Sequence, residues 1–180
     1  MELFWRALLT ENILMFKFLG IYLLLRFTGT AGEAARMGAM VAGGMILASW
    51  LGWIIDVHVL VPAGLEALRG WAFVLVVLVV ALVIARIAGR REGELWQSGL
   101  LNTAALGLLL INAGAGTNPL ATFLVSAGSA LGVLLVLVIV GSIMEATETT
   151  YVPAPLRGAP IRLMVMGVLA LAFMGFRFPL

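Results

Sequence analysis

The sequence lacks cysteine and carries little charge. None of its 180 residues is a cysteine, and only 11% of them are charged. Without thiols, the chain forms no disulfide and offers no thiolate to zinc or to an iron–sulfur cluster. Soluble globular chains carry about 25% charged residues, so this composition excludes an ordinary soluble domain. The formal net charge of +2 is too small to indicate a nucleic-acid partner.

Apolar residues fill the sequence instead. They make up 63% of the chain, and the mean hydropathy is +1.14, which predicts an all-α integral membrane protein. A span needs roughly 20 mostly apolar residues. Six segments are candidates: Leu8–Leu25, Met37–Ile55, Trp71–Ala88, Trp96–Ile111, Leu120–Met144 and Leu163–Phe176. The sixth is short, but Arg162 and Arg177 can extend from its ends to the interfaces. Residues 112–119, "NAGAGTNP", predict the turn between the fourth and fifth spans. We therefore expect one membrane domain, residues 1–180.

Arginine is unevenly distributed between the predicted loops. Loops after the first, third and fifth spans hold Arg26, Arg36, Arg86, Arg90, Arg91, Arg157 and Arg162. The other side holds only Arg6, Arg69 and Arg177. Because cytoplasmic loops are enriched in basic residues, this bias places the odd loops in the cytoplasm and both termini outside.

The two halves of the chain, about 1–90 and 91–180, follow a similar order. Each has an interrupted first span, a second span rich in glycine and alanine, and a further hydrophobic span. Three spans per half would invert one half relative to the other, and such repeats meet at the midplane through broken helices. We expect breaks in the first and fourth helices at Gly20 and Gly107. The alternative is that small residues simply allow close helix packing.

A few polar residues inside or beside the spans are functional candidates. Lys17 lies within the first span, and an ionisable group there is expected to face the protein interior or water. The alternative is that Lys17 extends to the headgroups. Glu11 is placed to pair with Lys17, while Asn12, Asn102 and Asn112 could bond to freed backbone groups.

Common catalytic and metal-binding motifs are absent. The sequence contains no P-loop, no G-x-S-x-G and no H-E-x-x-H. His58 stands alone beyond Asp56, which favours an interface residue over a metal ligand. We therefore expect no metal site and no catalytic residue.

Three stretches together resemble the RnfA/NqrE family. They are "NILMFKFLG" at 12–20, "LASWLGWIIDVHVLVPAGLEALRGWAFVLVVLVV" at 47–80 and "YVPAPLRGAPIRLMVMGVLALAFMGF" at 151–176. The last is the most specific, with a V-P-x-P-x-R-G turn before a final helix ending L-A-F-M-G-F.

The resemblance implies a six-span subunit of an Rnf/Nqr ion-translocating electron-transfer complex in a bacterial or archaeal cytoplasmic membrane. It further implies a homologous six-span partner of opposite topology, other Rnf/Nqr subunits and coupling to Na⁺ or H⁺. In the family, broken first and fourth helices of both partners each contribute a cysteine to one [2Fe–2S] cluster at the midplane.

This sequence departs from the family at the cluster. Tyr22 and Thr103 occupy the two cysteine positions. Hydroxyl and un-ionised phenol groups are poor iron ligands, so we expect this chain not to ligate the cluster. Three interpretations remain: a working subunit that relays electrons by another route, a redox-silent structural or ion-conducting relative, and a small transporter or channel unrelated to electron transfer.

Overall fold

The computed structural model describes residues 2–17, 19–27, 29–87, 103–115, 118–148 and 151–175. All regular secondary structure in these ranges is helical, as the sequence predicts. The elements in chain order are α1 (Glu2–Trp5), the π-helix η1 (Arg6–Thr10), α2 (Ile13–Lys17), α3 (Ile21–Phe27), α4 (Ala31–Ile55), the π-helix η2 (Asp56–Leu60), the 3₁₀-helix η3 (Glu66–Leu68), α5 (Arg69–Ile87), α6 (Thr103–Ala115), α7 (Pro119–Glu148), the 3₁₀-helix η5 (Ala154–Leu156) and α8 (Ala159–Met174).

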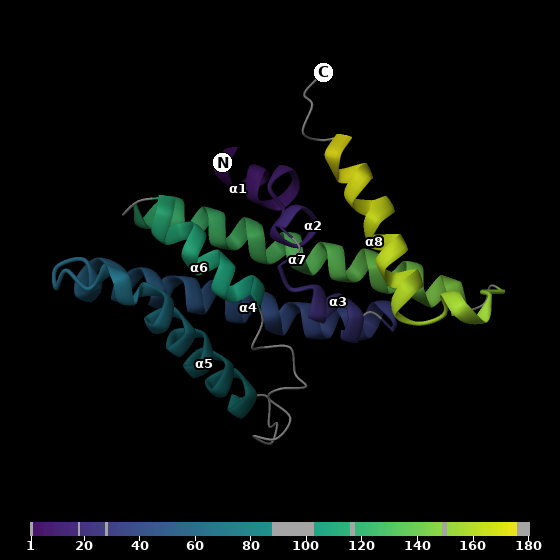
Figure 1. The fold of residues 1–180 in the computed structure, drawn as a ribbon, viewed down its shortest axis with the longest axis horizontal. Coiled ribbons are helices and arrows are strands. Elements are labelled where there is room, and N and C mark those ends of the chain that lie inside the picture. The colour runs from purple at the N-terminus through teal and green to yellow at the C-terminus, as the bar shows by residue number, and fades with distance from the viewer. Residues whose placement is uncertain are drawn as a thin grey trace.

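The two longest helices, α4 and α7, lie side by side at the centre of the fold (Figure 1). The start of α4 meets the end of α7, where the Ala31 amide donates to Glu145 Oε2 at 3.0 Å. Towards the other end of α4, Ser49 Oγ lies 2.6 Å from Ser126 Oγ. The helices are therefore antiparallel, and each step forward along α4 is matched by a step backward along α7.

Glycines allow this close approach. A methyl group at Gly141 of α7 would lie 2.7 Å from the Ala34 Cβ, and one at Gly38 of α4 would lie 2.8 Å from Leu134 Cδ1. Both distances are shorter than carbon–carbon van der Waals contact. Small residues thus bring the two backbones together, in the way that is typical of helix pairs in membranes.

The N-terminal segment, residues 2–27, packs on α7. Gly128 and Gly132 of α7 face the backbone carbonyls of Phe4 and Leu8, and a methyl group at these glycines would lie 2.5 and 2.9 Å from those oxygens. This segment is divided into short helices, with interruptions between η1 and α2 and between α2 and α3. The latter interruption agrees with the predicted break at Gly20.

The remaining helices flank the central pair. Helix α6 packs on α4 and α5, whereas α8 contacts α7 and the N-terminal segment. A methyl group at Gly52 of α4 would lie 2.8 Å from Leu109 of α6. The outer faces of α5 and α8 carry exposed apolar side chains, including Ile87 at 82% and Leu171 at 69% relative exposure. Such faces suit lipid or a partner subunit.

The spans differ in length from those predicted. Among the described residues, three helical stretches are long and apolar enough to cross a membrane, Ala31–Leu60, Glu66–Ile87 and Pro119–Thr147, and two shorter helices are apolar. Residues 112–115 continue α6, so the predicted turn at 112–119 begins too early. Asn112 stays within the helix because its side chain bonds to Ser49 of α4 and Ser126 of α7. Residues 96–102 of the predicted fourth span lie outside the described residues.

Candidate functional site

Gly20 separates α2 from α3 and adopts a conformation that favours glycine. Its φ of +88° lies in the left-handed region, which residues with a Cβ rarely adopt. The residue is also buried. A methyl group here would lie 3.1 Å from the Ala104 Cβ of α6. The backbone conformation therefore favours glycine at the interruption, and the contact with Ala104 leaves little room for a larger residue.

Thr103, the first residue of α6, contacts the interruption. The Gly20 amide donates a hydrogen bond to Thr103 Oγ1 at 2.9 Å, joining segments 83 residues apart in sequence. An interrupted helix leaves backbone groups without internal partners, and in a bilayer each such group costs several kcal/mol if unpaired. The Thr103 hydroxyl thus satisfies a backbone amide that the break exposes.

Gly107 is not a helix break, contrary to the prediction. It lies inside α6, which is continuous from Thr103 to Ala115. A methyl group at Gly107 would clash with Leu19 Cδ1. The glycine instead makes room for a side chain from the interrupted first segment. The alternative interpretation, that a small residue allows close helix packing, therefore fits Gly107.

Tyr22 and Lys17 lie on either side of Gly20. Tyr22 is 44% exposed, and Lys17, the last residue of α2, is also exposed. Both are therefore accessible from outside the helical core. Asn102 lies outside the described residues. The structure thus brings Gly20 and Thr103 into contact, with Lys17 and Tyr22 on the flanking turns.

Asn12 and Glu11 have local partners. Asn12 is fully buried. Its Oδ1 accepts from the Leu14 and Met15 amides at 3.0 and 3.3 Å, and its Nδ2 donates to the Leu8 carbonyl at 3.0 Å. Asn12 therefore caps α2, as asparagine commonly does. Glu11 pairs with Arg6 at 2.8 Å, both about half exposed, instead of with Lys17.

A polar cluster around Asn112 lies inside the fold, and its serine partners were not predicted from the sequence. Asn112 Nδ2 donates to Ser49 Oγ at 2.6 Å and to Ser126 Oγ at 2.9 Å, so the cluster joins α4, α6 and α7. Asn112 Oδ1 and Trp53 Nε1 are buried without a partner among the described residues. A cavity of about 10 Å³ lies beside them, about the size of one water molecule. The signal was available, because serine and asparagine in uncharged spans usually bond across helices.

Asp56 and Arg69 form an ion pair at the opposite end of α4 from the Glu145 contact. Arg69 Nε lies 2.5 Å from Asp56 Oδ1, and the Asp56 side chain is only 9% exposed. Because a buried carboxylate requires a partner, the pair ties η2 to the start of α5. Asp56 is thus structural, and His58, whose Nδ1 lies 3.1 Å from the Ile54 carbonyl oxygen, is engaged locally.

The donors at the interruption do not suit a [2Fe–2S] cluster. Such clusters are held by thiolates, and the chain has none. The Thr103 hydroxyl already accepts a hydrogen bond from the Gly20 amide. Among the described residues, no group of three or more histidine, aspartate or glutamate side chains is arranged to hold a metal ion. No cluster bound through thiolates of this chain is possible.

Interrupted and continuous apolar helices, joined by glycine contacts and buried polar bonds, define a multi-pass integral membrane protein. Residues 1–179 match the family described as "Rnf-Nqr subunit, membrane protein". Three relatives, from Escherichia coli O1:K1, Escherichia fergusonii and Citrobacter koseri, are each named as a component of an ion-translocating oxidoreductase complex. Each is 35% identical to this chain over 181 residues, covering 97% of this chain and 94% of the relative. The chain belongs to the Rnf-Nqr subunit family, and the resemblance seen in the sequence is confirmed.

Proposed function

We propose that this chain is a membrane subunit of an Rnf/Nqr-like ion-translocating electron-transfer complex. It forms half of a pseudo-symmetric subunit pair around a midplane site and contributes no cluster ligand to it. The observation that carries this proposal is the bond from the Gly20 amide to Thr103 Oγ1. The resemblance implies a cluster ligand at position 103. In this chain Thr103 instead joins α6 to the N-terminal segment.

The packing supports a 3+3 inverted repeat of six spans. The N-terminal segment contacts α7 and α8, and its counterpart in the second half, α6, contacts α4 and α5. The N-terminal segment therefore corresponds to α6, α4 to α7, and α5 to α8. Each element packs against the counterparts of the elements that its own counterpart contacts, and α4 packs against its own counterpart, α7. Together with the arginine bias, this arrangement supports a cytoplasmic membrane protein of bacterial or archaeal type with both termini outside. An alkaline phosphatase fusion at the C-terminus should be active, and a fusion within 88–95 should be inactive.

The exposed residues around the interruption support a partner at this face. Lys17, Tyr22 and Thr103 are all exposed, although polar side chains are unfavourable towards lipid. A homologous six-span subunit of opposite topology would cover them and place its own interrupted helices opposite. Lys17, Glu11, Asn12 and Asn102 are then candidates for the path of Na⁺ or H⁺. Asn12 would act by holding α2 in place.

The decisive experiment is purification of the chain with its native partners. A tag on this chain should recover a second six-span protein together with further Rnf/Nqr-like subunits. Iron analysis and EPR of the purified pair should show no [2Fe–2S] centre that depends on this chain. A [2Fe–2S] signal lost on mutation of a partner cysteine would contradict the cluster-free arrangement.

The outcome also separates the alternatives. Redox-dependent ion uptake by the complex supports a working subunit, in which this chain is non-catalytic or relays electrons. Uptake without redox dependence supports a structural or ion-conducting relative, and recovery of the chain alone supports a transporter. Lys17→Leu should impair assembly or coupling, whereas Lys17→Arg, which keeps the charge, should not. Unchanged activity of Lys17→Leu would remove Lys17 from the site.

A further inference from the structure

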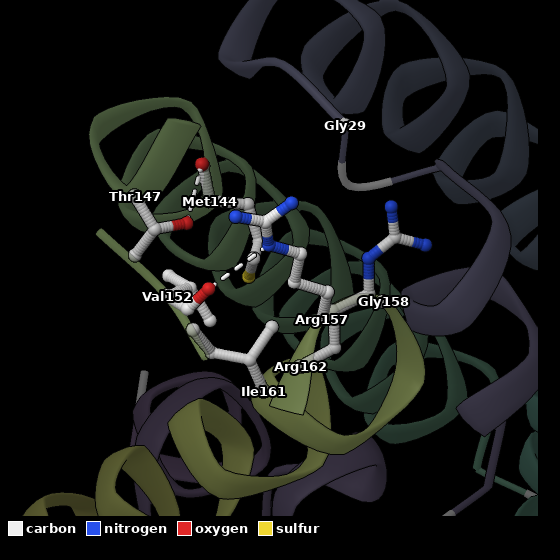
Figure 2. Close-up of a pocket in the computed structure, with 8 residues that line it drawn as sticks. All are labelled: Gly29, Met144, Thr147, Val152, Arg157, Gly158, Ile161 and Arg162. Atoms are coloured by element: carbon white, nitrogen blue, oxygen red, sulfur yellow. Dashed lines mark hydrogen bonds between the residues drawn. The ribbon is translucent and has the colours of Figure 1, made fainter. Parts of the chain in front are cut away.

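A cavity of about 380 Å³ lies at the end of the molecule where α7 stops and α8 begins (Figure 2). Its walls come from Met144 of α7, Gly29 before α4, and Gly158, Ile161 and Arg162 at the start of α8. The volume falls within the range of small-molecule sites, about 300–1,000 Å³. Among its described lining residues, none belongs to the functional candidates discussed above.

Two arginine side chains enter this cavity. Arg157 Nε donates to the Val152 carbonyl at 2.9 Å, which fixes the side chain and leaves its terminal nitrogens for other acceptors. Arg162 Nη1 donates to the Leu25 carbonyl at the end of α3. Figure 2 shows both side chains extending from the same turn towards the α7 end and Gly29.

The Arg162 guanidinium has an unused donor. Its Nε is buried and has no acceptor among the described residues. An orphaned buried donor is costly, and a charged one more so. Nε and Nη2 lie on the same edge of a guanidinium, and Nη1, on the other edge, is already bonded. Arg162 therefore brings its positive charge to the cavity wall with at least one donor that lacks a protein acceptor among the described residues.

The surroundings of the two arginines favour an anion. Gly158 precedes α8 with a φ of +86°, and no side chain caps the helix. The positive end of the α8 dipole therefore lies at the cavity. No acidic side chain is found among the described lining residues. The nearby Glu145 carboxylate instead accepts from the Ala31 amide.

We propose that this cavity binds a phosphate group. Two guanidinium groups and a helix N-terminus supply charge and donors, and a phosphate offers several acceptors in a fixed geometry. The apolar side chains of Met144 and Ile161 on the wall suit the carbon-bearing part of a phosphate ester. The source is either the headgroup of an anionic phospholipid in the cytoplasmic leaflet or a phosphate in solution.

The test uses the full-length chain in detergent with two probes. Native mass spectrometry measures retention of phosphatidylglycerol against phosphatidylcholine, and thermal melts compare inorganic phosphate with chloride at equal ionic strength. The double variant Arg157→Gln/Arg162→Gln should lower the affinity about tenfold or more, because each charge-assisted hydrogen bond is lost. Arg36→Gln is the matched control, because Arg36 is exposed near the same end of α4 and is not among the described residues that line the cavity.

The results distinguish the two sources. Preferential retention of phosphatidylglycerol without a phosphate-dependent melt assigns a lipid, and a phosphate-dependent melt lost in the double variant assigns a soluble phosphate. Arg162 also holds the Leu25 carbonyl, so Arg157→Gln alone provides a second variant if the double variant misfolds. Binding of neither probe, or an equal loss in Arg36→Gln, would overturn the proposal.

Discussion

The central α4–α7 pair and the N-terminal segment handle the same apolar environment in opposite ways. In the pair, two continuous helices satisfy their own backbone and approach through glycines such as Gly38 and Gly141. In the N-terminal segment the helix stops at Gly20, and a side chain from α6 supplies the missing acceptor. The continuous helices pack closely because their contact residues are small. The interrupted helix instead needs a polar side chain, Thr103, to accept the backbone amide that the break exposes.

The largest effect is expected in the central pair. Gly141→Leu would drive a side chain into Ala34 and the Thr30 carbonyl, atoms within 2.9 Å of the added Cβ. Overpacking of this kind costs about 3 kcal/mol, so little folded protein should survive size-exclusion chromatography. Gly43→Leu is the control, because an added Cβ there meets nothing within 4 Å. Equal losses in both variants would contradict the packing role of Gly141.

The next effect is expected at the interruption. Gly20→Ala should lower the free energy of unfolding in detergent by about 2 kcal/mol, because a left-handed residue with a Cβ is strained. Gly64→Ala is a matched control with a φ of +66° and open space around it. The excess loss in Gly20→Ala over Gly64→Ala measures the contact with Ala104. No excess would show that backbone conformation alone selects the glycine.

A smaller effect is expected from the hydrogen bond itself. Thr103→Val keeps the shape of the side chain and removes the acceptor for the Gly20 amide. Leaving that buried donor unpaired should cost about 1 kcal/mol, and amide hydrogen exchange at Gly20 should accelerate. Thr103→Ser retains the hydroxyl and should behave as wild type. If Val and Ser variants exchange at the same rate, the bond does not hold the interruption.

The smallest effect is expected at the Arg6–Glu11 ion pair. Both side chains are about half exposed, and exposed pairs contribute about 0–1 kcal/mol. Glu11→Gln should therefore leave the melting temperature nearly unchanged. A large shift would show that this end of the segment is tied into the fold as firmly as the central pair.

The fold could be predicted from sequence where the residues of a segment determine its structure without help from other segments. The break at Gly20 follows from a glycine in a span beside a lysine, and α4, α5 and α7 follow from long uncharged stretches. Gly107 is also a glycine inside a predicted span, although no lysine lies beside it, and α6 continues through it. What the small size of Gly107 serves is the packing of Leu19, which comes from another segment. Sequence alone does not distinguish these cases, because the contact is tertiary.

The same limit applies to polar residues. Thr103 could be singled out because the resemblance to the RnfA/NqrE family implies a cysteine at this position. That it accepts the Gly20 amide depends on two segments meeting in space. The cluster of Asn112, Ser49 and Ser126 likewise spans three helices, so periodicity within any one of them does not reveal it. Asp56 and Arg69 were visible as charges near span ends, but not as partners.

The matched glycines of α4 and α7 restrict how this protein can move. Gly38 and Gly141 leave no room for larger groups where the two helices meet, and closely packed interiors resist the strain that a displacement along the helix axis would cause. We therefore expect α4 and α7 to behave as one rigid unit. We expect any displacement within this protein to be larger in the short helices that flank Gly20, where the helix backbone is already interrupted, than in α4 and α7.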